Sequence, residues 1–124
     1  MALPKRVKVG GAFFQGYQLS VLTASASYVL HISTAVNKVV NGINFVANDS
    51  GAADFVSIGI YENPGTGALR TQIATSIFNP GPGIPLDFRF PALHHIRAGE
   101  DLRFIYVNSG SVPLAVNVYV ESIQ

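Results

Sequence analysis

Two adjacent histidines, His94 and His95, are the residues whose types and spacing most suggest chemistry in this chain. Imidazole nitrogens bind metals and transfer protons near neutral pH. Adjacent strand residues point to opposite faces, so both rings could reach one metal ion only in an irregular loop. The third histidine, His31, is distant in sequence, and no nearby acid completes a metal-site spacing. We therefore expect loop or interface histidines and predict no metal ion or other cofactor.

Oxygen-bearing side chains around two expected loops offer ligands of the kind that Ca²⁺ prefers. They are Asn48, Asp49, Asp54, Glu62 and Asn63. The spacing lacks the Asp-x-Asp-x-Asp-Gly pattern of a calcium loop, and Asp and Asn are also common turn formers. We favour turns in which these side chains satisfy their own backbone.

The chain contains no motif of nucleophilic or phosphate chemistry. It has no cysteine, no serine in a Gly-x-Ser-x-Gly elbow and no phosphate-loop fingerprint. The net charge of +1 gives no case for a nucleic-acid partner. We expect no enzymatic activity.

Aromatic residues suggest a binding role instead, because a flat ring offers sugars an apolar face. The five tyrosines are Tyr17, Tyr28, Tyr61, Tyr106 and Tyr119. The chain has no tryptophan, the ring best suited to such contacts. Core and interface positions are therefore the preferred interpretation of the tyrosines, and a carbohydrate- or receptor-binding module is the alternative function.

The N-terminal segment combines basic and aromatic residues around a glycine pair, Gly10-Gly11. These residues are Lys5, Arg6, Lys8, Phe13, Phe14 and Tyr17. A short basic arm over residues 1–11 would suit docking onto an acidic, partly apolar neighbour. The alternative is a frayed terminus followed by a first core strand.

The elements that must position these residues are short strands. Apolar residues alternate with polar ones from Leu19 to Val120, interrupted by Gly, Pro and Asn turns. Asn41-Gly42 is a strong type I′ signal and predicts a hairpin that joins strands 28–40 and 43–48. Pro91 is expected to end another strand, with a loop or single helical turn over 93–99. About eight strands in one domain, residues 1–124, predict an all-β antiparallel sandwich or barrel.

Two stretches resemble parts of jelly-roll sandwiches. Residues 56–69 look like a jelly-roll hairpin with a Gly/Pro turn, and residues 96–104 are similar to the Ala-Gly-Glu turn that opens a late strand. Similar stretches occur in bacterial adhesive modules, carbohydrate-binding modules and phage head or fibre proteins. The chain most resembles small phage virion proteins of the capsid-decoration type. This resemblance implies a jelly roll, a homotrimer and attachment to a capsid surface, with the major capsid protein or another virion protein as partner.

Composition indicates that much of the surface is covered. Only 12% of the residues are charged while 48% are hydrophobic, whereas soluble domains average about 25% charged. Candidate contact residues lie where outward strand faces are apolar, together with the histidine pair: Val29, Ala35, His94, His95, Ile105 and Val107. The chain lacks an apolar run of signal-peptide or membrane-span length. We therefore expect no membrane partner, and the resemblance to phage virion proteins implies a virion protein made in the host cytoplasm.

Overall fold

The computed structural model describes residues 6–9, 12–21, 26–33, 37–49, 53–62, 67–110 and 113–123. Within these ranges the secondary structure consists of strands. They are β1 (Arg6–Val9), β2 (Ala12–Val21), β3 (Ala26–Ser33), β4 (Lys38–Ala47), β5 (Phe55–Tyr61), β6 (Leu69–Phe78), β7 (Leu86–Ile96), β8 (Asp101–Asn108) and β9 (Leu114–Ser122). No helix in the described ranges is long and apolar enough to cross a membrane.

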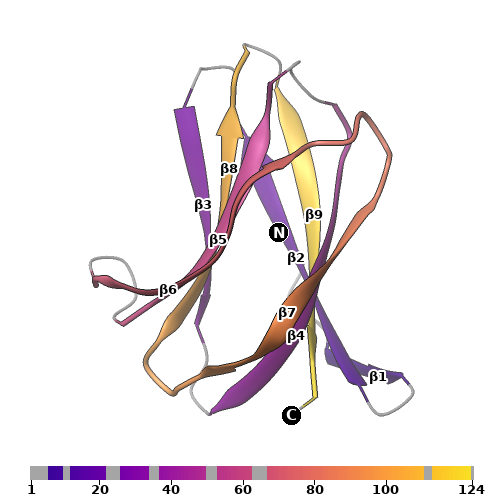
Figure 1. Cartoon of the computed structure of the whole chain (residues 1–124). Coiled ribbons are helices and arrows are strands. Elements are labelled where there is room, and N and C mark those ends of the chain that lie inside the picture. The colour runs from indigo at the N-terminus through magenta and orange to yellow at the C-terminus, as the bar shows by residue number, and fades with distance from the viewer. Residues whose placement is uncertain are drawn as a thin grey trace.

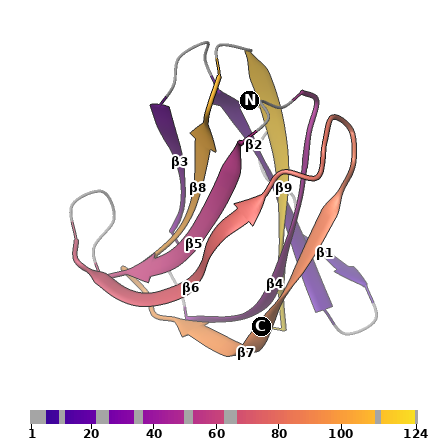
Figure 2. The same cartoon turned by 45° about the horizontal axis from the view of Figure 1, so that its top comes forward.

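The strands form two antiparallel sheets that face each other (Figures 1 and 2). One sheet has the order β1-β2-β9-β4-β7 and the other the order β3-β8-β5-β6. From β2 onward the chain changes sheet at every connection except β5–β6, and the last strand returns beside β2. This connectivity is that of a jelly roll. The expected all-β sandwich of jelly-roll type is confirmed.

The core lies between the sheets, because every second side chain of each strand points toward the opposite sheet. On β9 the buried residues are Leu114, Val116, Val118 and Val120, as the alternation predicts. The rings of Phe45 on β4 and Phe104 on β8 meet edge to face, with centroids 5.3 Å apart. Each fully buried side chain of this size contributes about 1.5–3 kcal/mol relative to an exposed one. This packing makes both sheets a rigid support for the residues on their outer faces.

The predicted hairpin at Asn41-Gly42 is wrong. Both residues lie inside β4, which is continuous from Lys38 to Ala47. Asn41 is an extra residue relative to β9, and the register with β7 also shifts between Val40 and Gly42. The local preference for a turn is overridden because β4 is held between β9 and β7 along its length. The buried Oδ1 of Asn41 has no hydrogen-bond partner.

The predicted strand end at Pro91 is also wrong, and the loop predicted over 93–99 is wrong for residues 93–96 and correct for residues 97–99. Strand β7 runs through Pro91 to Ile96. Residues 90–93 lie between the pairs Gly42–Arg89 and Val40–His94, so the proline falls where β7 bulges. Because β7 is an edge strand, the missing N–H donor is tolerated. The Ala-Gly-Glu turn follows directly, with φ +86° at Gly99, and β8 begins at Asp101.

Candidate functional site

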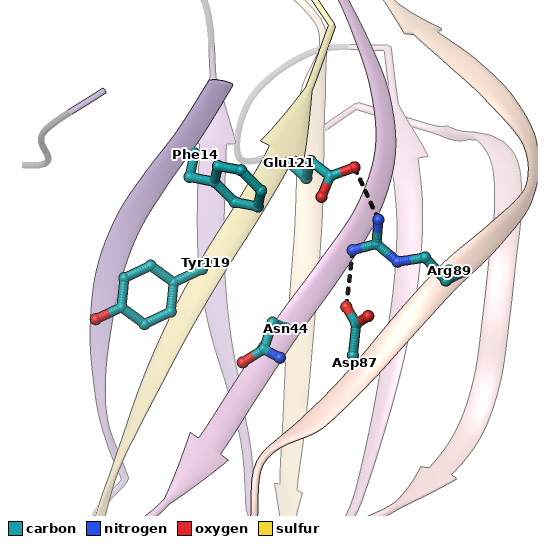
Figure 3. Close-up of a pocket in the computed structure, with 6 residues that line it drawn as sticks. All are labelled: Phe14, Asn44, Asp87, Arg89, Tyr119 and Glu121. Atoms are coloured by element: carbon teal, nitrogen blue, oxygen red, sulfur yellow. Dashed lines mark hydrogen bonds and ion pairs between the residues drawn. The ribbon is translucent and has the colours of Figure 1, made fainter. Parts of the chain in front are cut away.

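Two rows of side chains cross the outer face of the five-stranded sheet. One row runs Gly16, Tyr119, Asn44 and Asp87, and the next runs Phe14, Glu121, Gly42 and Arg89. Each row takes one residue from each of β2, β9, β4 and β7. The six residues with side chains line a pocket of about 450 Å³ (Figure 3).

The two glycines provide the space that shapes this pocket. A Cβ at Gly16 would lie 2.9 Å from Cε1 of Tyr119, so the tyrosine ring rests against the backbone of β2. A Cβ at Gly42 would lie 2.6 Å from Cζ of Arg89. The arginine can therefore cross β4 only because position 42 has no side chain. Glycine is needed here for close approach, not for a turn.

Arg89 is held between two carboxylates in the pocket. Its Nη1 donates to Glu121 Oε2 at 2.7 Å, and its Nη2 donates to Asp87 Oδ1 at 2.7 Å. Burial tends to lower the pKa of Arg89, but the contacts with Glu121 and Asp87 outweigh this effect and raise the pKa. The guanidinium is thus a fixed cation, and its plane and position are set by charge-assisted bonds.

The outer face of the four-stranded sheet is apolar at one end. Val29 is paired with Ile105, and the neighbouring row contains Val107, Phe55 and Phe78. The Phe55 and Phe78 rings lie 6.5 Å apart, and Phe78 is 64% exposed. We call these five residues the apolar face. The structure brings together three predicted contact residues, Val29, Ile105 and Val107, and adds the two phenylalanines, which the sequence reasoning missed.

A charged cluster borders the apolar face on the same sheet. Asp101 Oδ2 lies 2.6 Å from Nδ1 of His31 and accepts a bond of 2.8 Å from Nε of Arg103. The guanidinium of Arg103 lies 3.8 Å from the centroid of the Tyr61 ring. His31 therefore belongs to an ion-pair cluster at the surface. Among the described residues no group of three or more His, Cys, Asp or Glu side chains could hold a metal ion.

The histidine pair lies on the other sheet, on edge strand β7. The half-buried ring of His94 packs edge to face on Phe90, with centroids 5.7 Å apart, while His95 is exposed. The predicted contact residues are thus divided between two surfaces. Ala35 lies outside the described residues.

The N-terminal candidates are also divided. Arg6 and Lys8 lie in β1, which pairs with β2 at the edge of the five-stranded sheet, and Lys5 lies outside the described residues. Residues 6–9 are therefore part of the sandwich, although the predicted arm covered them. On β2, which also contains Phe13, the ring of Phe14 enters the outer pocket and Tyr17 packs against the core. Burial raises the pKa of Tyr17.

Asp54, a predicted calcium candidate, is instead buried in a hydrogen-bond network. Its Oδ2 accepts from the Tyr106 hydroxyl at 2.6 Å, and its Oδ1 accepts from the backbone N–H of Ser109 at 2.8 Å. Asn79 Nδ2 donates to the same tyrosine hydroxyl at 2.8 Å. Burial, followed by the neighbouring Asp54 carboxylate, raises the pKa of Tyr106 strongly. This network closes the end of the sandwich where β8 meets the loop before β5.

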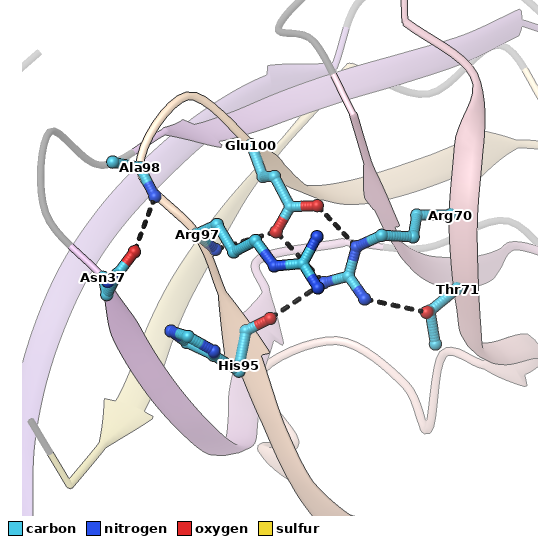
Figure 4. Close-up of polar contacts among 7 residues, drawn as sticks. All are labelled: Asn37, Arg70, Thr71, His95, Arg97, Ala98 and Glu100. Atoms are coloured by element: carbon cyan, nitrogen blue, oxygen red, sulfur yellow. Dashed lines mark hydrogen bonds and ion pairs between the residues drawn. The ribbon is translucent and has the colours of Figure 1, made fainter.

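A second polar cluster ties the two sheets together (Figure 4). Arg70 on β6 forms a two-point ion pair with Glu100, and its Nη2 also donates to the carbonyl of His95 on β7 at 2.8 Å. Burial tends to raise the pKa of Glu100, but the bond from the backbone N–H of Arg97 and the pairing with Arg70 lower it. These contacts give Arg70 and Glu100 a structural role, because they join strands of the two sheets.

The five tyrosines lie in different environments. Tyr106 is buried, Tyr17 and Tyr28 pack against the core, and Tyr61 lies beneath Arg103. Tyr119 is 47% exposed and lies in the outer pocket. The predicted core position is correct for Tyr106, Tyr17 and Tyr28. The sequence analysis did not identify the four polar residues of the pocket, which are Asn44, Asp87, Arg89 and Glu121. The only signal for the pocket in the sequence was the alternation of polar and apolar residues. Because of it, Asp87 and Arg89 share one face of their strand, and Tyr119 and Glu121 share one face of theirs.

No protein-family model and no curated protein sequence matches the chain. Solved structures with similar folds include the infectious bursal disease virus VP2 subviral particle, at 14% identity and a TM-score of 0.43 over 98% of this chain and 33% of that chain. A CBM4 structure matches at 10% identity and a TM-score of 0.40 over 91% of this chain and 82% of that one. The Podospora anserina GH26-CBM35 β-(1,4)-mannanase matches at 13% identity and a TM-score of 0.45 over 94% of this chain and 27% of the enzyme. The chain spans about a third of the viral protein.

Proposed function

We propose that the chain is a structural virion protein, a homotrimeric capsid-decoration protein that binds and stabilises a phage head through the major capsid protein or another virion protein. The observation behind this proposal is the apolar face on β3, β8, β5 and β6. It lies on the surface of a chain with only 15 charged residues, 8 basic and 7 acidic.

The occupant that we propose for the apolar face is a second copy of this chain. The face has an apolar centre, and the His31–Asp101–Arg103 cluster lies at its border, an arrangement typical of subunit interfaces. A standard interface buries about 800 Å² per partner. Two such contacts would cover about a quarter of the 6346 Å² of accessible surface, consistent with the scarcity of charge.

A cyclic trimer needs two different surfaces on each subunit, because its contacts are heterologous. The second surface in this proposal is the edge strand β7. There Leu93 is 58% exposed, and the exposed His95 lies two residues away. The apolar face of one subunit would pack against β7 of the next. Three docking surfaces on one rigid trimer would then reinforce each other on the capsid through effective concentration.

Native mass spectrometry of the purified chain and two variants tests the assembly. We expect a trimer for the wild type and monomers for both Val29→Lys and Leu93→Lys, since either change places a charge in every contact. Ile123→Lys is the matched control, because Ile123 is also an exposed apolar residue (43% exposed) and is not among the residues that define either surface. Circular dichroism establishes that each variant is folded.

Two outcomes would overturn the assembly. If the wild type is a monomer at high concentration, the proposed role is excluded. If it is a dimer that only Val29→Lys disrupts, the contact is two-fold and involves the apolar face alone. Co-sedimentation of the trimer with candidate phage heads then tests capsid attachment. A trimer that stays in the supernatant with every head preparation contradicts the decoration role while leaving the assembly intact.

A further inference from the structure

We infer that the pocket on the outer face of the five-stranded sheet binds a neutral saccharide. This pocket and the proposed assembly surfaces have no residue in common: on β7 the pocket takes Asp87 and Arg89, whereas the proposed assembly surface there is formed by Leu93 and His95. Its lining comes from four strands whose register is set by the core, so the site is positioned by rigid elements (Figure 3).

The aromatic part of the pocket consists of Tyr119 and Phe14, which lie on neighbouring strands in adjacent rows. The Tyr119 ring is supported from one side by the backbone at Gly16, yet 47% of the residue stays exposed. An exposed ring that is held in place offers an apolar contact to the C–H groups of a sugar and loses little conformational freedom on binding.

The polar part of the pocket offers both donors and acceptors within reach of that ring. Asn44 lies between Tyr119 and Asp87 in the same row, and it can donate and accept. Arg89 supplies fixed N–H donors, while Asp87 and Glu121 have carboxylate oxygens with further lone pairs. A sugar hydroxyl also donates and accepts, so this mixed set matches a polyhydroxylated ligand.

The charge of the lining argues for a neutral ligand. Asp87 and Glu121 outnumber Arg89, so the residues that line the pocket have a net charge of −1. Phosphates and acidic sugars would meet an excess of negative charge. A cationic peptide side chain offers only donors, so it provides no acceptor for the N–H groups of Arg89 that Glu121 and Asp87 do not bind, and it brings two cations together. The volume of about 450 Å³ lies in the range of small-ligand sites, about 300–1,000 Å³.

The test uses the full chain on an array of neutral oligosaccharides, followed by calorimetric titration with the best-bound neutral sugar. We expect Tyr119→Ala and Arg89→Ala each to weaken binding at least about 10-fold, the effect of losing roughly 1.4 kcal/mol. Tyr119→Phe keeps the ring and should retain most of the affinity. Asn117→Ala is the matched control, because Asn117 is exposed on the same strand, two residues before Tyr119, and lies outside the pocket.

The inference is overturned if no neutral sugar binds at millimolar concentration. It is also overturned if Tyr119→Ala and Arg89→Ala, shown by circular dichroism to be folded, bind like the wild type, or if acidic sugars or a lysine-rich peptide bind in preference. The oligomer mass of each variant is measured in parallel. Loss of sugar binding without loss of the trimer separates this site from the assembly role.

Discussion

The guanidinium of Arg89 on β7 reaches the carboxylate of Glu121 on β9 at 2.7 Å, although β4 lies between the two strands. The contact passes over Gly42, the β4 residue paired with both of them. A long side chain can cross a strand in this way only where the crossed residue has no Cβ. This ion pair therefore depends on a glycine that the sequence presents as a turn signal.

Gly42→Ala should displace Arg89 from Glu121 without unfolding the protein. The added methyl group meets the flexible end of a side chain, so the guanidinium can move aside and the backbone stays in place. We expect the free energy of unfolding to change by no more than about 1 kcal/mol, while saccharide binding falls as far as in Arg89→Ala. Urea unfolding and titration of both single variants and the double variant check this. Additive losses of binding in the double variant would show that position 42 does not act through Arg89.

Tyr106→Phe should destabilise the sandwich and change its response to alkali. At neutral pH, loss of the buried bond to the Asp54 carboxylate costs about 1.5–3 kcal/mol. The pKa of Tyr106 is raised in the folded state above its ordinary value of 10.0, so the folded state retains this proton above pH 10 while the unfolded chain loses it. The stability of the wild type should therefore fall above pH 10, by up to about 1.4 kcal/mol per pH unit for this proton.

Urea unfolding of wild type and Tyr106→Phe at pH 7, 9, 10 and 11 measures this response. The difference in stability between the two proteins should shrink as the pH rises above 10. Tyr17→Phe is the comparison, because the pKa of Tyr17 is also raised by burial but its hydroxyl is not part of the Asp54 network. A constant difference between wild type and Tyr106→Phe over the whole range would contradict the assignment.

Glu100→Gln should weaken the contact between the two sheets in a pH-dependent manner. The two-point pairing with Arg70 and the bond from the Arg97 N–H favour the ionised carboxylate, and we expect a loss of about 2 kcal/mol at pH 7. The pKa of Glu100 is lowered below its ordinary value of 4.5 in the folded state. This contribution to stability is therefore present above pH 4.5 and is lost as the pH falls below it.

Thermal unfolding of Glu100→Gln and wild type at pH 7, 5 and 3 tests this expectation. The difference in stability should be largest at pH 7 and smallest at pH 3. Asp87→Asn serves as control, since Asp87 also pairs with an arginine but its side chain is 53% exposed, and exposed pairs contribute little. A difference that does not change with pH would mean that Glu100 acts through packing alone.

Neutralising the basic N-terminal residues should weaken capsid attachment and leave the trimer intact. Because residues 6–9 form an edge strand, the triple change Lys5→Gln, Arg6→Gln and Lys8→Gln is a sharper test than removal of the segment. We expect wild-type binding to phage heads to decrease between 50 and about 500 mM salt, as charge-driven association does. The triple variant should bind weakly at every salt concentration. The mass of the trimer should not respond to salt, because the apolar face contributes no charge.

The predicted strands and core faces are correct where each depends on local alternation. Leu102, Phe104 and Tyr106 share the inner face of β8, and Val116 and Val118 share that of β9, as period two requires. The errors at Asn41-Gly42 and Pro91 arise from residues whose local preferences are strong. A turn dipeptide and a strand breaker were overridden by pairing with neighbouring strands, and such pairing depends on residues far away in the chain.

The sequence alone determined an all-β sandwich or barrel, because alternation and turn residues are read within a few positions, and the jelly-roll form was implied by the resemblance of two stretches to jelly-roll sandwiches. The sequence also identified part of the apolar face, since Val29, Ile105 and Val107 each alternate along their strands with residues that point into the core. Only the tertiary structure decided which side chains become neighbours. Phe14, Asn44, Arg89 and Tyr119 come from four strands, and the register that brings them into one pocket is set by packing between the sheets rather than by any local signal.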